Sequence, residues 1–305
     1  MKYIRIAEIM CSAVLVSSCG LSRYAANTEY PAVEVQGSCN GILEECFYDC
    51  SDDGPSRRRM YVYLPNDYHE SDRHYPVLYL LHGARGNETS WIIKGDLLHE
   101  IDSLTEAAAM DTTLVVLPNV NQYDDDQDYG RSRLKGALES FFETDGMVEA
   151  AFVTDVVMTI DSLYRTIPDK QHRAIAGLSI GGMQSIYISA NNPEIFSYVG
   201  MFSPMVHPVL RRSDNSSFYK NLKTKQEKQF ESPPELYSIM IGKSDFYYPR
   251  MLAYSRYLES KGYPFEMDVS SGGHDWYNWK AYVGKFMQKL WNEDTSSYED
   301  DIKYP

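Results

Sequence analysis

A serine enclosed by glycines, at the junction of a predicted strand and a predicted helix, constrains this chain more than any other feature. Residues 174–176 form a short apolar run typical of a buried strand, and residues 181–190 are predicted to form a helix. The pentapeptide G-L-S-I-G joins them, with Ser179 at its centre. Bulky residues in place of these glycines would clash in a tight turn. The pattern therefore predicts a compact strand–turn–helix unit with Ser179 at the turn.

Strands and helices alternate along the rest of the chain. Short apolar runs predict strands at residues 58–64, 77–81, 114–117, 198–202, 236–241 and 265–269. Helical spacing predicts helices at residues 96–110, 147–164, 247–261 and 277–290. Continuous apolar runs are typical of parallel strands that are buried on both faces. The order therefore predicts an α/β fold, a mostly parallel sheet with helices on both faces.

The length of 305 residues suits one large α/β domain and is too short for two. We expect this domain at residues 37–292, followed by a polar tail at 293–305. Two polar segments, 121–145 and 205–233, interrupt the alternation and are predicted to be loops beside the site. The first contains an acidic run, but Tyr129 and Lys135 stand where a calcium-binding loop needs glycine and glutamate, so calcium binding is not expected.

The N-terminus has the pattern of an export signal. Lys2 and Arg5 precede an apolar run, and small residues precede Cys19. Residues 16–19 resemble a bacterial lipobox, in which the cysteine receives the lipid. This predicts a lipoprotein-type signal peptide at 1–19, lipidation of Cys19, a tether at 20–36, and a location at the bacterial outer membrane or cell surface. Because Glu8 interrupts the apolar run, a plain cleaved signal peptide is the alternative.

Charge and cysteine content narrow the classes of partner. The formal net charge is −14, with no basic cluster, so the protein lacks the charges that neutralise phosphates and is not expected to bind nucleic acid. Its membrane contact is expected through the lipid anchor alone. Cys39, Cys46 and Cys50 allow one disulfide, between Cys46 and Cys50 or between Cys39 and either of them, or none. No histidine is close enough in sequence to complete a zinc site, and neither a metal nor another cofactor is expected.

A general base for Ser179 can be found by chain order. A serine hydroxyl needs an adjacent base, an acid that orients the base, and donors for the oxyanion. With this type of turn, the order along the chain is nucleophile, acid, histidine. Of the seven histidines only His207 and His274 follow Ser179, and His207 precedes any suitable acid. His274 lies in a loop after a predicted strand, so we expect it to be the base.

The acid is expected at the end of a strand. Between Ser179 and His274, Asp214 lies in an irregular polar segment and Asp268 lies within a predicted strand. Asp245 follows the apolar strand 236–241 through a short turn, and active sites of α/β proteins collect at such strand ends. We therefore predict Asp245 as the acid, with a helix-capping role as the alternative.

Several further residues are expected around this site. The backbone N–H of Ile180 is the predicted first oxyanion donor, and Ala84 or Arg85, in the loop after residues 80–83, supplies the second. His82 is expected to be structural. The aromatic residues Trp91, Tyr247 and Trp276 fall near the loops around the site and are predicted to contact substrate, with core packing as the alternative.

Taken together, several segments resemble the esterase D-like family. They are Y-P-V-L-Y-L-L-H-G at 75–83, R-A-I-A-G-L-S-I-G-G at 173–182, G-K-S-D at 242–245, and the stretch 272–279. The resemblance extends over roughly residues 37–292 and implies an α/β-hydrolase fold and hydrolysis of carboxylic esters through an acyl-enzyme, without a metal. It places the nucleophile, acid and base at Ser179, Asp245 and His274. Ile180 departs from the methionine of many relatives, which is a volume-conserving change.

Secreted members of that family include feruloyl esterases and acetyl xylan esterases. The resemblance therefore implies that the substrate is a plant polysaccharide or oligosaccharide that carries feruloyl or acetyl esters, such as xylan. Two alternatives remain. One is an esterase for another small molecule, such as a siderophore-like ester or a thioester, and the other is a glycan-binding protein without activity on the same scaffold.

Overall fold

The structure is a computed structural model. It describes residues 39–51, 57–121, 146–206 and 217–291, and the backbone of 143–144 and 209–210. Several sequence predictions lie outside the described residues: the signal peptide with Cys19, the tether, the acidic run, the position of His207, and the polar tail. Among the described residues, no helix is long and apolar enough to span a membrane.

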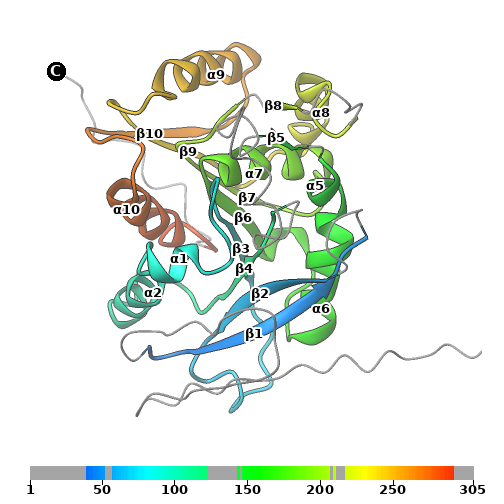
Figure 1. The fold of residues 1–305 in the computed structure, drawn as a ribbon, viewed down its shortest axis with the longest axis vertical. Helices are drawn as coiled ribbons and strands as arrows, with labels where there is room; N and C mark the ends of the chain where they lie inside the picture. Colours follow the sequence, from blue (N-terminus) through cyan, green and yellow to red (C-terminus); the bar gives the residue numbers. More distant parts are fainter. Residues whose placement is uncertain are drawn as a thin grey trace, which may run out of the picture.

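An eight-stranded sheet forms the centre of the molecule (Figure 1). Its spatial order is β1 (Ile42–Asp49), β2 (Arg57–Leu64), β4 (Leu114–Pro118), β3 (Val77–Leu81), β6 (Arg173–Leu178), β7 (Tyr198–Phe202), β9 (Leu236–Gly242) and β10 (Glu266–Ser270). β2 is antiparallel to both of its neighbours, and the strands from β4 to β10 are parallel to one another. The carboxyl ends of β3, β6, β7, β9 and β10 therefore meet at one edge of the sheet.

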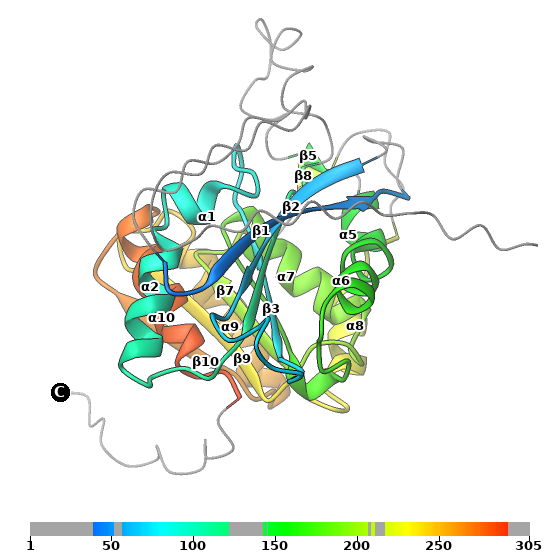
Figure 2. The ribbon, with the colours of Figure 1, turned by 90° about the horizontal axis from the view of Figure 1, so that it is seen from below.

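Helices cover both faces of this sheet, as Figure 2 shows from below. One layer contains α1 (Ser90–Ile93), α2 (Leu97–Glu106) and α10 (Trp276–Met287). The other contains α5 (Met147–Phe152), α6 (Met158–Leu163), α7 (Ile180–Asn191), α8 (Leu222–Gln229) and α9 (Tyr248–Lys261).

Alternation along the strands builds the two cores. In β3, Val77 and Tyr79 belong to one buried cluster, and Leu78 and Leu80 belong to the other. Successive side chains of a strand point to opposite faces, so a strand buried on both sides needs an unbroken apolar run. The strand order and the two helical layers confirm the predicted α/β-hydrolase fold.

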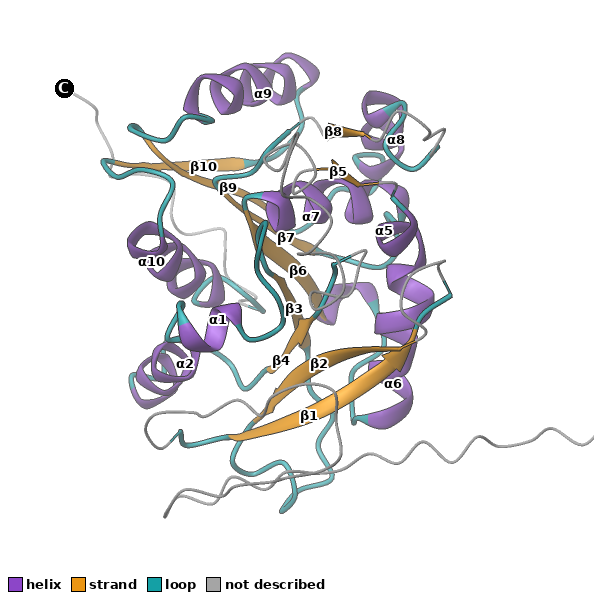
Figure 3. Cartoon of the chain, in the orientation of Figure 1, coloured by secondary structure: helices purple, strands orange, loops and turns teal. Residues whose placement is uncertain are grey.

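Some elements were not predicted from the sequence (Figure 3). The edge strand β1 lies in a segment that was assigned only to the start of the domain. A helix, α8, lies within the polar stretch 205–233, which was predicted to be a loop. Its sequence L-K-T-K-Q-E-K-Q has no apolar stripe, although most of its residues are good helix formers. A short pair, β5 (Glu143–Thr144) with β8 (Val209–Leu210), and a 3₁₀ turn, η2 (Lys170–His172), were not predicted either.

The helix predicted at 147–164 is interrupted. Between α5 and α6 the chain forms a π-helical segment, η1 (Val153–Val157). Asp155 in this segment accepts hydrogen bonds from the backbone N–H of Ser51 at 2.8 Å and from its hydroxyl at 2.9 Å. The wider π-helical turn thus lies where Asp155 is hydrogen-bonded to Ser51, just after β1. Helical spacing in the local sequence does not predict this contact.

The cysteines of the N-terminal region form no disulfide with one another in the described part of the chain. Cys46 lies on β1 and Cys50 follows it directly. Four residues of extended chain span about 13 Å, whereas a disulfide needs Cα atoms within about 7 Å. The extended conformation of β1 therefore excludes the Cys46–Cys50 pairing that the sequence left open.

Candidate active site

The turn around Ser179 has the backbone geometry that its glycines indicate. Ser179 has φ 54° and ψ −112°, and its N–H donates to the carbonyl of Phe202 at 2.8 Å. A Cβ on Gly177 would lie 2.5 Å from the carbonyl carbon of Gly181, and a Cβ on Gly181 would lie 2.5 Å from the carbonyl oxygen of His82. Glycines are required at these two positions because β6, α7 and the end of β3 meet there.

Two other loops meet the turn, and they also approach closely through glycines. A Cβ on Gly242, at the end of β9, would lie 1.8 Å from the carbonyl oxygen of Gly272 in the loop after β10. The backbone N–H of Ser244 donates to that same oxygen at 3.0 Å. Asn278 on α10 donates from its side chain to Gly273 at 2.7 Å. These contacts place the loop that carries Asp245 against the loop that carries His274.

Ser179, His274 and Asp245 form a continuous hydrogen-bonded chain. His274 Nε2 lies 3.1 Å from Ser179 Oγ, and His274 Nδ1 lies 2.9 Å from Asp245 Oδ2. A carboxylate can only accept here, so the Nδ1–H donates to Asp245 and Nε2 is left to accept from the serine hydroxyl. The side chain of Asp245 is completely buried, whereas that of His274 is 15% exposed. This is the arrangement that a nucleophilic serine needs, and it joins three residues that are far apart in sequence.

Asp245 is held in its ionised form. Burial alone would raise the pKa of this carboxyl, but hydrogen bonds from His274 and from the backbone N–H of Tyr247 outweigh burial, so the pKa lies below its usual value. The hydroxyl of Ser203 also favours the carboxylate, although it does not reach full hydrogen-bond geometry. An ionised, buried carboxylate keeps the imidazole in the orientation just described.

His82 is structural, as expected. It is 4% exposed, and its Nε2 accepts from the backbone N–H of Val120 at 3.1 Å. Because Nε2 accepts, the proton is on Nδ1, which donates to the carbonyl of Gly83 at 2.9 Å. Burial lowers the pKa of His82 to about 4. A neutral imidazole thus ties the end of β4 to the start of the loop after β3.

That loop, residues 83–89, borders the serine. A Cβ on Gly83 would lie 3.5 Å from Ser179 Cβ, so the next residue, Ala84, follows directly at the site. Ile180 is the first residue of α7, where backbone N–H groups have no partner within the helix. Both positions suit the predicted oxyanion donors, and the donor role of Ile180 and Ala84 stays a prediction.

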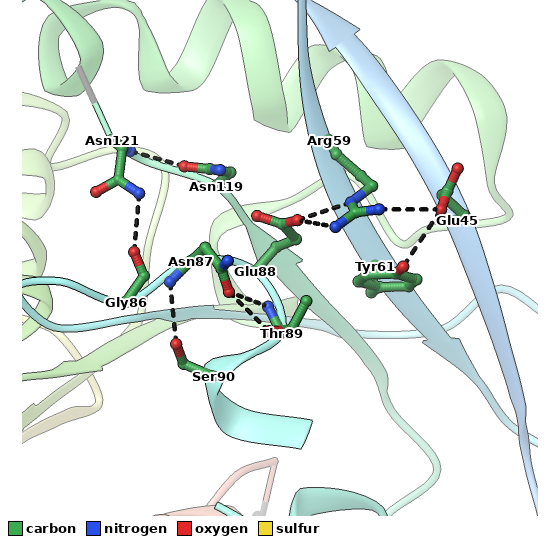
Figure 4. Close-up of polar contacts among 10 residues, drawn as sticks. All are labelled: Glu45, Arg59, Tyr61, Gly86, Asn87, Glu88, Thr89, Ser90, Asn119 and Asn121. Atoms are coloured by element: carbon green, nitrogen blue, oxygen red, sulfur yellow. Dashed lines mark hydrogen bonds and ion pairs between the residues drawn. The ribbon is translucent and has the colours of Figure 1, made fainter. Parts of the chain in front are cut away.

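A buried ion pair anchors the same loop (Figure 4). Glu88 Oε1 accepts from Arg59 Nε at 2.7 Å and lies 2.6 Å from Arg59 Nη2. Arg59 belongs to β2, and the two side chains are 3% and 1% exposed. Arg59 also lies 3.5 Å from Glu45, which accepts from the hydroxyl of Tyr61 at 3.2 Å. The pair connects the loop after β3 to the antiparallel part of the sheet.

Amide side chains complete the anchoring of this loop (Figure 4). Asn121, just after β4, donates to the carbonyl of Gly86 at 2.8 Å, and its own N–H donates to Asn119 Oδ1 at 3.0 Å. The N–H of Asn87 donates to Ser90 Oγ at 3.0 Å. These residues were not predicted from the sequence, and the bond from Asn121 to Gly86 joins two segments that are far apart in the chain.

The predicted substrate contacts fall in different environments. Trp91 is 1% exposed and donates from its indole N–H to the carbonyl of Leu81, so it belongs to the core and the prediction of substrate contact is wrong for it. Tyr247 is 7% exposed, and its ring centroid lies 5.5 Å from that of His274. Trp276 is half-buried between Trp91 and Trp279, at 5.3 Å from each ring. Tyr247 thus contacts the histidine ring, whereas Trp276 packs on Trp279, which contacts it; substrate contact by Tyr247 and Trp276 stays a prediction.

One aromatic residue at the site was missed. Phe246 is 66% exposed, and its ring centroid lies 4.4 Å from that of His274. Its position directly after Asp245 could have drawn attention to it. Within the described residues, no group of three or more histidine, cysteine, aspartate or glutamate side chains could hold a metal ion.

Comparison with known proteins places these residues in context. The family model Esterase matches residues 51–284. The sequence is 29% identical over 236 residues to an endo-1,4-beta-xylanase/feruloyl esterase of Xylanibacter ruminicola, an alignment that covers 75% of this chain and 28% of that protein. The chain thus spans less than a third of the length of this curated relative.

Solved structures share the fold. A ferulic acid esterase of Anaeromyces mucronatus, in complex with ferulic acid, is 20% identical with a TM-score of 0.63, over 86% of this chain and 93% of that one. An S-formylglutathione hydrolase of Staphylococcus aureus is 18% identical with a TM-score of 0.61, over 85% of this chain and all of that one.

Proposed function

Because the chain belongs to the Esterase family, we propose that it hydrolyses carboxylic esters with Ser179 as the nucleophile, His274 as the base and Asp245 as the orienting acid. The observation that carries this proposal is the hydrogen-bonded chain from Ser179 Oγ through both nitrogens of His274 to the buried carboxylate of Asp245.

The mechanism follows from this geometry. Ser179 Oγ attacks the ester carbonyl carbon while its proton passes to His274 Nε2, and Asp245 stabilises the imidazolium that forms. The N–H groups of Ile180 and Ala84 are proposed to bind the negative oxygen of the tetrahedral intermediate. His274 then gives the proton to the leaving alcohol oxygen as the C–O bond breaks. Water then gives a proton to His274 Nε2 and attacks the acyl carbonyl carbon, and His274 returns that proton to Ser179 Oγ as the bond between the acyl group and the serine breaks, which releases the acid.

For the substrate, we propose feruloyl or acetyl esters on a plant polysaccharide or oligosaccharide such as xylan. The similarity to a xylanase/feruloyl esterase supports this class. The aromatic rings around His274 suit a phenolic acyl group or the face of a sugar. We further propose that Cys19 carries a lipid that holds the enzyme at the cell surface, where polymers are accessible.

Replacement of the serine tests the catalytic proposal. The Ser179→Ala variant is expected to lose about 10⁴-fold or more of kcat on an aryl ester, because the nucleophile is gone while binding remains. It should also fail to react with a fluorophosphonate probe. Ser260→Ala, on the exposed face of α9, is the matched control and should keep full activity and labelling. Substantial activity in Ser179→Ala would exclude this mechanism.

Product analysis tests the substrate class. Ferulate and acetate released from feruloylated and acetylated arabinoxylan are measured by chromatography. Release of either acid supports the proposal. Failure on both, together with hydrolysis of a thioester such as S-formylglutathione, would favour the alternative of a small-molecule esterase. Failure of wild-type protein to label with the probe would favour a glycan-binding protein without activity.

A further inference from the structure

Phe246 presents an unusual amount of apolar surface at the mouth of the site. Among the described residues the exposed large apolar side chains are Ile93, Met158, Phe246 and Tyr277. Phe246, at 66% exposure, is the one of these that contacts the histidine ring, with centroids 4.4 Å apart and planes inclined by 45°. Single exposed apolar residues are common on protein surfaces, so it is the contact of this ring with His274, and not its exposure alone, that points to contact with a ligand.

The turn that orients Asp245 also fixes Phe246. The N–H of Asp245 donates to Gly242 at 3.1 Å, its carboxylate accepts from Tyr247 N–H at 2.8 Å, and its carbonyl accepts from Tyr248 N–H at 3.0 Å. The ring of Phe246 also contacts that of Tyr247, with centroids 4.5 Å apart. Two ring contacts and a hydrogen-bonded turn therefore hold Phe246 in place before any ligand binds, which lowers the entropic cost of binding.

The chemistry of the histidine decides which half of the ester meets this ring. In the breakdown of the tetrahedral intermediate, His274 Nε2 delivers its proton to the alcohol oxygen, so the alcohol lies against His274. The carbonyl oxygen lies toward the N–H groups of Ile180 and Ala84 instead. A ring packed on the imidazole therefore borders the alcohol half of the substrate.

We propose that Phe246 is a recognition residue for the alcohol half of the ester, a flat platform on which a sugar ring rests while its ester oxygen receives the proton from His274. This inference rests on the proposed function and sharpens it. A sugar offers an apolar C–H face that suits an aromatic surface, whereas a methyl alcohol is too small to use the platform. We therefore predict that the enzyme discriminates between esters by their alcohol part, whatever the acyl group is.

The test varies the alcohol while the acyl group stays the same. Hydrolysis of methyl ferulate is compared with that of ferulate esterified to an arabinose-bearing xylo-oligosaccharide, in wild-type protein and in Phe246→Ala. We expect KM for the sugar ester to rise about 5- to 10-fold in Phe246→Ala, and kcat/KM for methyl ferulate to change less than about twofold. Phe246→Tyr, which keeps a flat ring, should retain the wild-type preference, whereas Phe246→Leu should lose it.

Controls separate this inference from other roles. Met158→Ala removes a side chain of similar exposure, 60%, on α6, and should change neither substrate's kinetics. Equal losses on both esters, with a shifted pH profile, would mean that Phe246 acts by holding His274, and would overturn the inference. So would a loss on feruloyl but not on acetyl esters of the same sugar, which would place the ring on the acyl side. If wild-type protein hydrolyses neither sugar ester, the proposed substrate class fails as well. A thermal unfolding curve verifies that each variant is folded.

Discussion

At the scale of single residues, Ser179 occupies backbone space that residues other than glycine rarely adopt. With φ 54° and ψ −112°, it stores strain of about 1–3 kcal/mol that the surrounding contacts must offset. Its N–H bonds to Phe202, and its carbonyl accepts from Met205 at 3.2 Å. The strained turn holds the serine hydroxyl 3.1 Å from His274 Nε2.

His82 makes the stability of the protein depend on pH. Its pKa is about 4 in the folded chain because of burial, and about 6.5 in an unfolded chain. As the pH falls, His82 is therefore protonated in the unfolded chain before it is protonated in the folded chain. The folded state keeps its full stability above pH 6.5 and loses stability as the pH falls to 4. A difference of about 2.5 pKa units corresponds to about 3 kcal/mol in the free energy of unfolding.

Urea unfolding between pH 7.5 and pH 4 measures this effect. The wild-type protein should lose up to about 3 kcal/mol more over this range than His82→Asn, which has no imidazole at the site. His99→Asn, which alters an exposed histidine on α2, should keep the wild-type slope. The same slope in wild-type and His82→Asn protein would contradict the assignment.

At the scale of elements, the loop after β3 is held by side chains from other parts of the sheet in addition to its own short helix α1. Arg59 on β2 and Asn121 after β4 hold it from two strands. Removal of one partner of a buried ion pair costs about 3–5 kcal/mol when the other charge is left uncompensated, and the cost is smaller here because Arg59 also lies 3.5 Å from Glu45. The loop also carries Ala84, a proposed oxyanion donor, so its position should influence the transition state more than substrate binding.

Glu88→Gln is therefore expected to lower the free energy of unfolding by up to about 3 kcal/mol and to lower kcat with little change in KM. Chemical denaturation and steady-state kinetics measure the two effects. The double variant Arg59→Met/Glu88→Leu, with apolar residues in both places, should regain most of the stability but not the kcat. Full recovery of kcat in the double variant would show that the ion pair does not position the loop.

At the scale of the whole molecule, the proposed site and the predicted lipid acceptor, Cys19, lie in separate segments of the chain. Near the start of the described residues, the N–H of Asn40 donates to Asp102 on α2 at 3.0 Å, and β1 pairs along its whole length with β2. Membrane attachment and catalysis should therefore be separable. This follows because the residues proposed for the reaction all lie within the parallel part of the sheet and its loops.

Cys19→Ser tests that separation in a bacterial host. We expect it to abolish incorporation of radiolabelled palmitate and to release the protein from the membrane fraction, while kcat on an aryl ester stays unchanged. Arg5→Ala/Lys2→Ala, which weakens the basic start of the signal, should reduce export without changing the lipid site. Palmitate incorporation into Cys19→Ser would exclude Cys19 as the acceptor.

Local sequence determined the fold class and the order of the chemical groups. Apolar runs predicted most strands of the parallel sheet, because burial on both faces leaves no room for polar alternation, as in Val77–Leu81. Glycines predicted the turn at Ser179, and chain order singled out Asp245 and His274. Both kinds of inference depend on residues that are near in sequence or on a fixed order, and neither needs the tertiary structure.

Tertiary structure alone decided which side chains meet. Trp91 and Phe246 are both aromatic residues in loops or short elements near the site, yet one is 1% and the other 66% exposed. No local pattern distinguishes them, because burial depends on what packs above each ring. The contact of Gly242 with Gly272 and the ion pair of Arg59 with Glu88 likewise each join a strand to a loop that is distant in sequence. The sequence was enough to predict the chemical groups of the proposed site. Packing between segments that are distant in sequence determines which side chains surround those groups.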